Sequence, residues 1–267
     1  MEIFYENKSK DFFFRDTTHP DARRILEFSS HLHQHIELVI LKKGHSQFTV
    51  DTQIYDAEAG DLVVIFPNQI HSIKTLEPEE FMIMIVNPDI MPEYAKQFAS
   101  FVPESNLLKG VDKDPELMDI ANSISKIHYS DIPFRNDILR GYLLTFFGKL
   151  LGKLAIKDIQ EKGYDILGII LNYCTANFDK PISLEVLEKD LHISKYYISH
   201  TFSSRLHIGF NDYINSLRVS NACKHLRKTD KSITEISYLV GFNTMRTFNR
   251  AFKKQLGMTP KEYRMKN

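Results

Sequence analysis

Residues 232–263 read SITEISYLVGFNTMRTFNRAFKKQLGMTPKEY, and residues 183–213 read SLEVLEKDLHISKYYISHTFSSRLHIGFNDY. The two stretches align at a nearly constant offset, so that, for example, Phe202 corresponds to Phe252. Each copy shows a short helix, a tight turn and a longer helix, which is the pattern of a helix-turn-helix DNA-binding motif. Two copies in one chain predict two helices that enter the same face of a DNA duplex.

The charges divide unevenly along the chain. The whole sequence holds 34 basic and 34 acidic residues. Residues 165–267 contain 16 Lys and Arg against 9 Asp and Glu, a balance of +7, and residues 1–164 carry the opposite balance. Because the basic part coincides with the repeat, we expect this part, and not the acidic one, to meet DNA phosphates. Chance scatter of surface charge is the alternative.

The longer helix of each copy has an apolar and a polar face. Apolar side chains expected in a core recur at every fourth position, as Ile198, Phe202 and Leu206 and as Phe248, Phe252 and Leu256. The opposite faces carry Tyr196, Ser199, His200 and Ser203 in the first copy, and Met245, Arg246, Asn249, Arg250 and Lys253 in the second. Arg246 and Arg250 match the paired acceptors of guanine, and Asn249 matches adenine. Each position could equally be an ordinary solvated surface residue.

The rest of the chain divides into strands and helices. Residues 1–87 contain short apolar runs, at 38–41, 62–66 and 81–86, which are typical of a sandwich or small barrel. Residues 92–158 change to helical periodicity. Residues 210–227 read as one helix, whose length of roughly 27 Å suits a spacer between two recognition helices. A closing helix is expected to begin at Pro260, with Thr259 as its N-cap.

A specific pattern covers most of this C-terminal part. It consists of Arg218, Ala222 and Leu226, the run SITEI at 232–236, GF at 241–242, Phe248, Arg250, FK at 252–253 and the run GMTPKEYR at 257–264. This pattern resembles the AraC/XylS family of bacterial transcription regulators. The resemblance implies two recognition helices in adjacent major grooves, usually to activate transcription, with RNA polymerase as a protein partner. It places the base-reading positions on Tyr196, Ser199 and His200, and on Met245, Arg246, Thr247, Asn249 and Arg250.

Two residues of the first copy depart from the family pattern. Glu188 occupies a position where a small residue usually lets the helices approach each other. His192 stands in the turn where glycine, the residue most tolerant of positive φ, is usual. These departures predict a looser first unit, and they make its base contacts less certain than those of the second.

The densest group of chemically reactive side chains lies in the N-terminal part, where residues 31–37 read HLHQHIE. In a strand, His31, His33, His35 and Glu37 would share one face. The spacing His-x-His-x3-Glu-x6-Gly, followed later by Gly60, Pro67 and His71, resembles the cupin barrel. The second part of this motif is one residue short and lacks its glycine.

Three interpretations of this group remain open. Metal-bearing cupins would use the equivalents of His31, His33, Glu37 and His71 to bind a divalent ion, and three imidazoles with a carboxylate suit Fe, Mn, Ni or Zn. Regulators with this barrel mostly bind organic effectors, so we favour an effector pocket in which the four residues orient a small molecule. The histidines could also lie on the outer face of the sheet. We expect no cofactor.

Residues 137–157 carry a stripe at steps of three and four, formed by Leu139, Leu143, Phe146, Leu150 and Leu154. The segment resembles the helices through which such regulators dimerise, and Lys149 and Lys153 on the flanks of the stripe suit a paired, partly wet helix. We therefore expect a homodimer. The alternative is a helix packed wholly on its own barrel.

The sequence predicts an α+β multidomain protein. A cupin-like β-barrel with dimerisation helices spans residues 1–157, a linker spans 158–164, and an all-α domain of two helix-turn-helix units spans 165–267. We expect a sequence-specific transcription regulator, an activator, whose barrel senses a small-molecule effector. A metal-dependent cupin enzyme with a nucleic-acid-binding appendage is the alternative, but no dedicated catalytic motif supports it.

Two further expectations concern the cell compartment and the cysteines. The chain contains no apolar run as long as a membrane span, and its first residues lack the pattern of a signal peptide. We therefore expect no membrane partner and a cytoplasmic location. Cys174 and Cys223 have no metal-type spacing and are expected to be small core residues rather than a disulfide.

Overall fold

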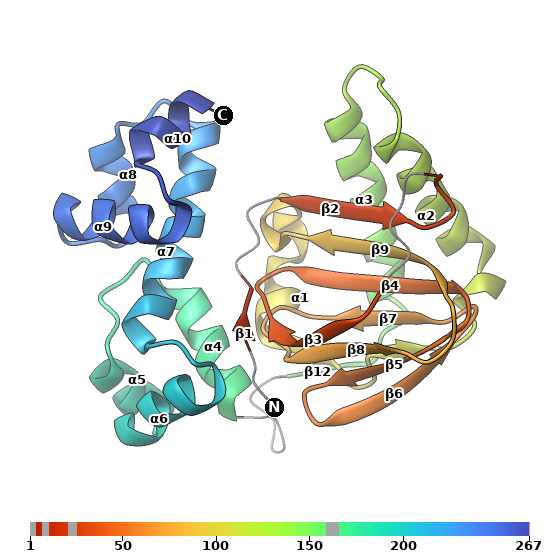
Figure 1. Ribbon diagram of the computed structural model, residues 1–267, viewed down its shortest axis with the longest axis horizontal. Helices are drawn as coiled ribbons and strands as arrows, with labels where there is room; N and C mark the ends of the chain where they lie inside the picture. The colour runs from red at the N-terminus through yellow and green to blue at the C-terminus, as the bar shows by residue number, and fades with distance from the viewer. Residues whose placement is uncertain (1–3, 7–10, 21–25, 159–165, 267) are drawn as a thin grey trace. The chain divides into compact units, whose positions relative to one another are not determined.

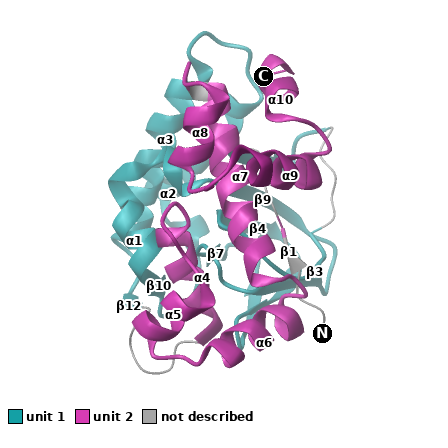
Figure 2. Ribbon diagram, turned by 90° about the vertical axis from the view of Figure 1, so that its left-hand side faces the viewer, with its two compact units in different colours: residues 1, 10–165 teal, residues 2–9, 166–267 magenta. Residues whose placement is uncertain are grey.

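The computed structural model describes residues 4–6, 11–20, 26–158 and 166–266 (Figure 1). The chain divides into two compact units (Figure 2), one of which ends at Asp165 while the other begins at Ile166. The short strand β1 (Phe4–Tyr5) groups with the second unit. Of the linker expected at residues 158–164, residues 159–164 lie outside the described part of the chain.

The first unit is built mainly from strands. These are β2 (Phe12–Asp16), β3 (Phe28–Leu32), β4 (Ile36–Lys43), β5 (His45–Val50), β6 (Gln53–Glu58), β7 (Leu62–Ile65), β8 (His71–Thr75), β9 (Glu80–Val86), β10 (Phe101–Pro103), β11 (Leu107–Leu108) and β12 (Ile156–Asp158). Its helices are the short 3₁₀ turns η1 (Pro88–Ile90), η2 (Pro92–Tyr94) and η3 (Val111–Lys113), and the α-helices α1 (Ala95–Ser100), α2 (Pro115–His128) and α3 (Arg135–Leu151).

The strands form two antiparallel sheets that face each other. One sheet contains β3, β8, β5 and β6 as neighbours in this order, and the other has the order β11-β7-β4-β9-β2. A core of buried side chains fills the space between them, with Phe48 and Ile73 from the first sheet and Val39, Val63 and Ile83 from the second. The expected barrel-like domain of short strands is confirmed, and each of the three apolar runs lies in a strand of the second sheet or extends just beyond it.

Strand β4 is buried on both faces because helices cover the outside of its sheet. Val39 and Leu41 point between the sheets, whereas Leu38 and Ile40 point the other way, into a second core. Helices α2 and α3 complete this second core with Leu117, Ala121, Ile124, Leu139, Leu143, Phe146 and Leu150. The alternation of a strand thus distributes one apolar run between two cores.

The apolar stripe of α3 packs inside its own domain. Leu139, Leu143, Phe146, Leu150 and Leu154 all belong to the core against the outer face of the sheet, and none of them is more than 8% exposed. The prediction that this stripe forms a dimer contact is therefore wrong, because the stripe itself packs on the sheet of its own domain. The stripe is apolar because it covers a sheet face. A helix that packs on a sheet and a helix that pairs with another helix show the same spacing of apolar residues.

The helical pattern expected over residues 92–158 is correct only in part. The short strands β10 and β11 interrupt the segment, and β12 ends it by pairing with β10 in an antiparallel register. Isolated strands of two or three residues carry no periodicity of their own, so a pattern argument misses them.

The second unit is entirely helical apart from the short strand that groups with it. It contains α4 (Ile166–Asn177), α5 (Leu184–Leu191), α6 (Lys195–Arg205), α7 (Phe210–Lys228), α8 (Ile233–Leu239), α9 (Met245–Leu256) and α10 (Pro260–Lys266). Helix α7 is the predicted spacer, and Thr259 forms the predicted cap, because its Oγ1 accepts a hydrogen bond from Glu262 N at 3.2 Å. Cys174 and Cys223 are free and buried, as expected. Among the helices of the described residues, none has the length and apolar character needed to cross a membrane.

The first prediction tests the packing of α3. Phe146 is fully buried in the helix–sheet core, so Phe146→Ala should lower the free energy of unfolding by about 3–5 kcal/mol through lost burial and a residual cavity. Thr145→Ala removes a side chain from the exposed side of the same helix and should change it by less than about 0.5 kcal/mol. Urea unfolding of the full chain, followed by circular dichroism, measures both. Unchanged stability in Phe146→Ala would show that the stripe is not a core element.

Candidate DNA interface and sensor site

The first helix-turn-helix unit is formed by α5 and α6, and side-chain caps define where each helix begins. Ser183 accepts a hydrogen bond from Val186 N, and Ser194 accepts one from Tyr197 N, each at 3.3 Å. Such caps satisfy the free N–H groups of a first helical turn. The start of α6, and therefore the set of side chains it exposes, is fixed by its own sequence.

Glu188 ties the two helices of this unit together. Its Oε1 accepts a hydrogen bond from the backbone N–H of Lys195, the first residue of α6, at 3.0 Å. A carboxylate at a helix N-terminus satisfies a free donor and interacts favourably with the helix dipole. The departure from the family pattern at Glu188 thus supplies an additional cap for α6, which the sequence comparison did not foresee.

His192 adopts the backbone conformation that its position requires. It ends α5 in the left-handed region, at φ 55° and ψ 31°. The equivalent turn of the second unit has Gly241 at φ +90°, where an added Cβ would lie 2.7 Å from the carbonyl oxygen of Asp179. The second unit therefore needs glycine for space as well as for conformation, whereas the first accepts histidine at a conformational cost.

The second unit, α8 and α9, is capped more completely than the first. Ser232 and Glu235 form a reciprocal capping box at the start of α8, and Thr244 accepts a hydrogen bond from Thr247 N at the start of α9. Phe242, Phe248 and Phe252 form the core behind the recognition helix. The expected core stripes of both units are buried, except that Leu256 is only partly so.

Most of the side chains predicted to contact DNA are exposed. On α6 these are Tyr196, Ser199 and His200, and on α9 they are Arg246, Asn249, Arg250 and Lys253. Tyr196 is 78% exposed, and its ring stacks against that of His200 with centroids 6.1 Å apart. These seven side chains are placed so that they can meet DNA; their contacts remain a prediction.

Met245 and Thr247 are less accessible than the rest of the predicted set. Both are partly buried. The sulfur of Met245 accepts a hydrogen bond from Ser237 Oγ at 3.0 Å, and Met245 packs against the core of the second unit. Thr247 Oγ1 lies 2.9 Å from Thr244 Oγ1, within the cap of α9. These two residues help to support α9, and their predicted contacts with DNA stay a prediction.

The structure adds a basic residue that sequence reasoning missed. Lys254 is exposed and forms an ion pair with Asp212 of α7 at 2.9 Å. It lines a pocket of about 600 Å³ between α7 and α9, together with Arg250 and Asn215. Asp212 lies on another helix, so no spacing in the sequence could reveal this pair.

Arg218 joins the two halves of the DNA-binding unit. It donates hydrogen bonds to the carbonyl oxygens of Phe178 and Lys180, at 2.7 and 3.1 Å. Its guanidinium also lies over the ring of Phe242, 5.6 Å from the centroid. Arg218 thereby connects α7 both with the segment that precedes α5 and with the core of the second unit, which gives this residue of the family pattern a structural role.

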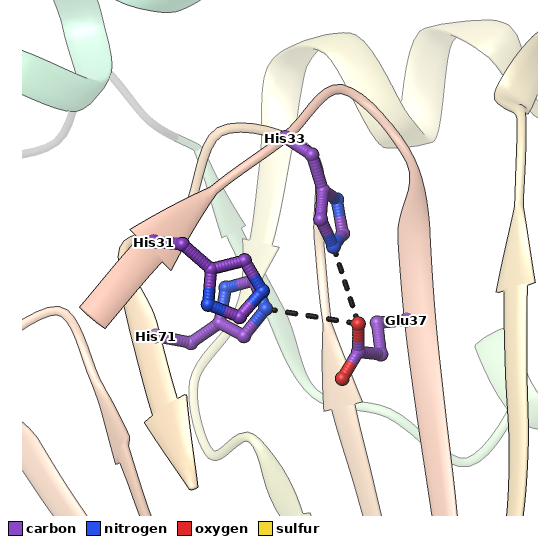
Figure 3. A group of neighbouring side chains, drawn as sticks. All are labelled: His31, His33, Glu37 and His71. Atoms are coloured by element: carbon purple, nitrogen blue, oxygen red, sulfur yellow. Dashed lines mark hydrogen bonds and ion pairs between the residues drawn. The ribbon is translucent and has the colours of Figure 1, made fainter. Parts of the chain in front are cut away.

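The sensor cluster of His31, His33, Glu37 and His71 comes together from separate strands (Figure 3). His31 lies on β3 and pairs with His71 at the start of β8, whereas Glu37 lies on β4 of the opposite sheet. His33 lies in the turn between β3 and β4. The expectation of one continuous strand with residues 31–37 on one face is wrong, because the chain turns there and passes from one sheet to the other.

All four side chains are buried, with exposed fractions of 1–2%. The interpretation that the histidines lie on the outer face of the sheet is therefore wrong. His33 Nε2 lies 3.2 Å from Glu37 Oε2, and the rings of His31 and His71 are 4.1 Å apart between centroids. Burial raises the pKa of the Glu37 carboxyl, but hydrogen bonds from His33 and His71 and their Coulombic attraction outweigh it and hold this pKa well below its usual range.

Each histidine of the sensor cluster uses Nδ1 to bind a backbone carbonyl oxygen. The partners are Ser29 for His31 at 2.8 Å, His35 for His33 at 3.0 Å and Gln69 for His71 at 2.9 Å. A carbonyl oxygen can only accept, so each Nδ1 carries a proton in these hydrogen bonds. Sequence reasoning found the four side chains but not the three carbonyl groups, which no side-chain pattern encodes.

Comparison with known proteins agrees with this division of the chain. A model described as a helix-turn-helix domain matches residues 187–266, and one described as an AraC-like ligand binding domain matches residues 5–131. The uncharacterized HTH-type transcriptional regulator YdiP of Escherichia coli K12 is 27% identical over 250 residues, which cover 89% of this chain and 81% of YdiP. The regulatory protein SoxS of the same organism is 30% identical over 99 residues, 37% of this chain and 92% of SoxS. A crystal structure of apo ToxT from Vibrio cholerae aligns with 97% of this chain and 98% of ToxT at 18% identity, with a TM-score of 0.41.

The second prediction concerns the two turns. His192→Gly should stabilise the first unit by about 0.5–1 kcal/mol, because glycine adopts the left-handed region without strain. Gly241→Ala should destabilise the second unit by at least about 1–3 kcal/mol, since it adds strain and a steric conflict with Asp179. Hydrogen exchange of the backbone amides of α5 and α8 in the full chain reports each unit separately. Equal effects in the two units would contradict the difference between the turns.

Proposed function

This chain belongs to the AraC/XylS family of transcription regulators, with an N-terminal ligand-binding domain and a C-terminal helix-turn-helix DNA-binding domain, and from this we propose that it is an effector-responsive activator of transcription. One observation carries the proposal. Two capped helices, α6 and α9, each have a buried apolar stripe and an opposite exposed polar face, and they are joined by α7 in the basic half of the chain. We infer that the two helices read successive major grooves of one operator.

Base readout is assigned mainly to α9. Arg246, Asn249 and Arg250 are exposed and spaced by three and four residues, so they project from one side of the helix. A guanidinium can donate two hydrogen bonds to guanine, and an asparagine amide can pair with adenine. Lys253, one turn beyond Asn249, is assigned to a phosphate. Tyr196, Ser199 and His200 of α6 are assigned to the second groove.

Activation needs a protein surface that stays free when α9 lies on DNA. Tyr238 and Leu239 of α8 are 56% and 47% exposed, and neither belongs to the core of the second unit. We propose that this part of α8 contacts RNA polymerase. We also propose a cytoplasmic location, because a transcription regulator acts where the DNA is.

A homodimer is still proposed, but through a different surface. The connection between α2 and α3 and the first turn of α3 expose three apolar side chains: Phe134 at 78%, Ile132 at 39% and Ile138 at 37%. Adjacent exposed apolar side chains of this kind mark interaction surfaces. A second copy of the domain that packs on this apolar tip would shield them while leaving the α3 stripe in its own core.

The alternative of a metal-dependent enzyme with a nucleic-acid-binding appendage has less support. YdiP, described as an HTH-type transcriptional regulator, matches 89% of the chain, and the regulatory protein SoxS matches 37% of it. The sensor cluster would then serve to bind an effector rather than to turn over a substrate. We propose that binding at the cluster of His31, His33, Glu37 and His71 alters the affinity for DNA or the activation of transcription.

The third prediction tests base readout. Arg250→Ala should weaken binding to the cognate operator by about 1–3 kcal/mol and relax the preference at one base pair, because a bidentate contact is lost. Lys253→Ala should weaken all sequences about equally and lower the slope of log K against log salt by about 1. Fluorescence anisotropy with operator and scrambled duplexes over a range of salt concentrations distinguishes the two.

Lys96→Ala serves as the control for this comparison, because Lys96 is an exposed lysine on α1 of the sensor domain and its loss changes the net charge equally. It should leave operator binding unchanged. If Arg250→Ala behaves like Lys96→Ala, the assigned face of α9 is wrong. If the unmodified chain binds operator and scrambled duplexes equally, the proposal of a sequence-specific regulator fails.

The fourth prediction tests the apolar tip. Phe134→Asp should convert a dimer at micromolar concentration into a folded monomer, because a charge cannot be buried at an apolar contact without a partner. Ile54→Asp is the control, since Ile54 is an exposed apolar residue elsewhere in the same domain, on β6. Multi-angle light scattering gives the mass of each variant. A monomer already in the unmodified protein, or a dimer that persists in Phe134→Asp, would reject the apolar tip as the interface.

A further inference from the structure

The pocket between α7 and α9 combines an ion pair with an excess of positive charge. It is lined by residues from the beginning of α7, from the turn before it and from one side of α9, and its volume is about 600 Å³. Arg250 and Lys254 contribute two positive charges, and Asp212 contributes one negative charge. The amides of Asn215 and Gln255 also line it. The net charge and the supply of N–H donors both favour an anion as occupant.

One donor among the residues that line the pocket lacks an acceptor. Gln255 lies on α9, and its Nε2 is buried without a hydrogen-bond partner among the residues that the structure describes. A buried amide donor without an acceptor costs free energy. An acceptor group that enters the pocket would offset this cost, whereas an apolar occupant would leave it in place.

The pocket lies beside the side chains assigned to base readout. Arg250 belongs both to the exposed face of α9 and to the wall of the pocket. Lys254 follows it by four residues, so it lies on the same side of the helix, roughly 6 Å further along the axis. A recognition helix contacts bases with its N-terminal residues. We therefore expect the last turn of α9, which contains Lys254, to approach the sugar-phosphate backbone that borders the major groove.

Asp212 holds Lys254 in the way that a phosphate would. Its Oδ1 accepts a hydrogen bond from Lys254 Nζ at 2.9 Å. A carboxylate and a phosphodiester both offer anionic oxygens to an ammonium group. The side chains of Lys254 and Asp212 are 69% and 51% exposed, so their ion pair contributes little to stability and can be exchanged. Such an exchange requires movement of the Lys254 side chain but no change in the fold of the helices.

The position of Asp212 on α7 keeps its charge when Lys254 changes partner. It lies in the first turn of the helix, where the helix dipole favours a carboxylate. A phosphate that approaches Lys254 is nevertheless repelled by this carboxylate, because the two negative groups compete for one cation. Asp212 should therefore weaken the binding of any duplex whose backbone enters the pocket.

We propose that the pocket between α7 and α9 binds one phosphodiester of the DNA backbone, which replaces Asp212 as the partner of Lys254. Asp212 then acts as an internal competitor that lowers the affinity of α9 for DNA. The proposal rests on the proposed function in one respect, because it requires α9 to lie in the major groove. It assigns no base contact, since phosphate contacts carry no sequence information directly.

The fifth prediction tests the ion pair with the full chain and an operator selected from random duplexes. Asp212→Asn should tighten operator binding by about 2- to 5-fold, because the competitor of the phosphate is lost. Lys254→Ala should weaken binding and lower the slope of log K against log salt by about 1. Fluorescence anisotropy over a range of salt concentrations measures both variants, and circular dichroism shows that they are folded.

Asp230→Asn is the matched control for Asp212→Asn. Asp230 is exposed, its replacement changes the net charge equally, and it lies just beyond the far end of α7, roughly 25 Å from Asp212. The control should alter operator affinity by less than about 1.5-fold, because salt screens a charge at this distance. Equal effects of the two substitutions would overturn the role of Asp212 as competitor. Lys96→Ala again serves as the control for the loss of a lysine.

A duplex with one neutral methylphosphonate in its backbone locates the phosphate. When the substitution is moved along the operator, at least one position should weaken binding of the unmodified chain. At that position the loss should be smaller for Lys254→Ala by a factor of at least about 2, because the contact is already missing. Lys253→Ala should couple to a different phosphate. If no position couples to Lys254, the phosphate site is overturned.

Two further comparisons separate the proposals. Inorganic phosphate at constant ionic strength should compete with the operator equally in the unmodified chain and in Lys254→Ala; stronger competition in the unmodified chain would show a free anion as the ligand and overturn the DNA phosphate. Operator recognition with an unchanged salt slope in Lys254→Ala would reject only the phosphate site. Equal binding of selected and scrambled duplexes, with the lower slope in Lys254→Ala, would reject the proposed function and leave the phosphate site standing.

Discussion

The burial of β4 on both faces is the constraint on which the sensor domain depends. Its even-numbered residues Leu38 and Ile40 pack against the helices, and its odd-numbered residues Val39 and Leu41 pack between the two sheets. Glu37 shares the parity of the odd set, so the alternation of the strand places a carboxylate at the end of the central apolar core. A register shift of one residue would move Glu37 to the helix-covered face. It would also exchange the two sets of apolar side chains of β4 between the two cores. The position of the sensor cluster thus follows from the requirement that two cores be filled at once.

The histidines reach Glu37 because the chain passes from one sheet to the other beside it. His31 and His71 are cross-strand partners in the first sheet, and His33 occupies the turn that leads into β4 of the second. Two sheets that face each other bring these positions together, and the register of β3 against β8 shifts between Phe28 and His31. The site consequently depends on the packing of the sheets, and a change in the occupant of the cluster would act directly on their contact. This is a physical route by which a bound ligand can alter the sensor domain.

The DNA-binding unit shows how two copies of one pattern can be stabilised differently. Both recognition helices have a side-chain cap and an apolar stripe, but their turns differ. The second copy uses Gly241, close to Asp179, and a capping box on α8, whereas the first uses His192 in a left-handed conformation and compensates with the Glu188 contact to Lys195. The expected weakness of the first copy is therefore offset in part by a hydrogen bond between its two helices. The two copies share a fold because their cores are equivalent. They differ at their turns, where His192 and Gly241 have different surroundings.

The sequence alone determined the elements whose periodicity is strong. The repeat located α5, α6, α8 and α9, the family pattern supplied their exposed positions, and the apolar runs located β4, β7 and β9. It also named the four residues of the sensor cluster. Tertiary structure decided the partners of each face: the stripe of α3 looks the same whether it covers a sheet or another subunit, and only packing showed that Phe146 belongs to its own core. Likewise, each carbonyl group that fixes a histidine lies only two residues from it, and Glu188 accepts its hydrogen bond from Lys195 N across a turn, but these contacts depend on the backbone conformation and not on side-chain periodicity. Periodicity reports which side of an element is apolar, but it carries no information about what that side meets.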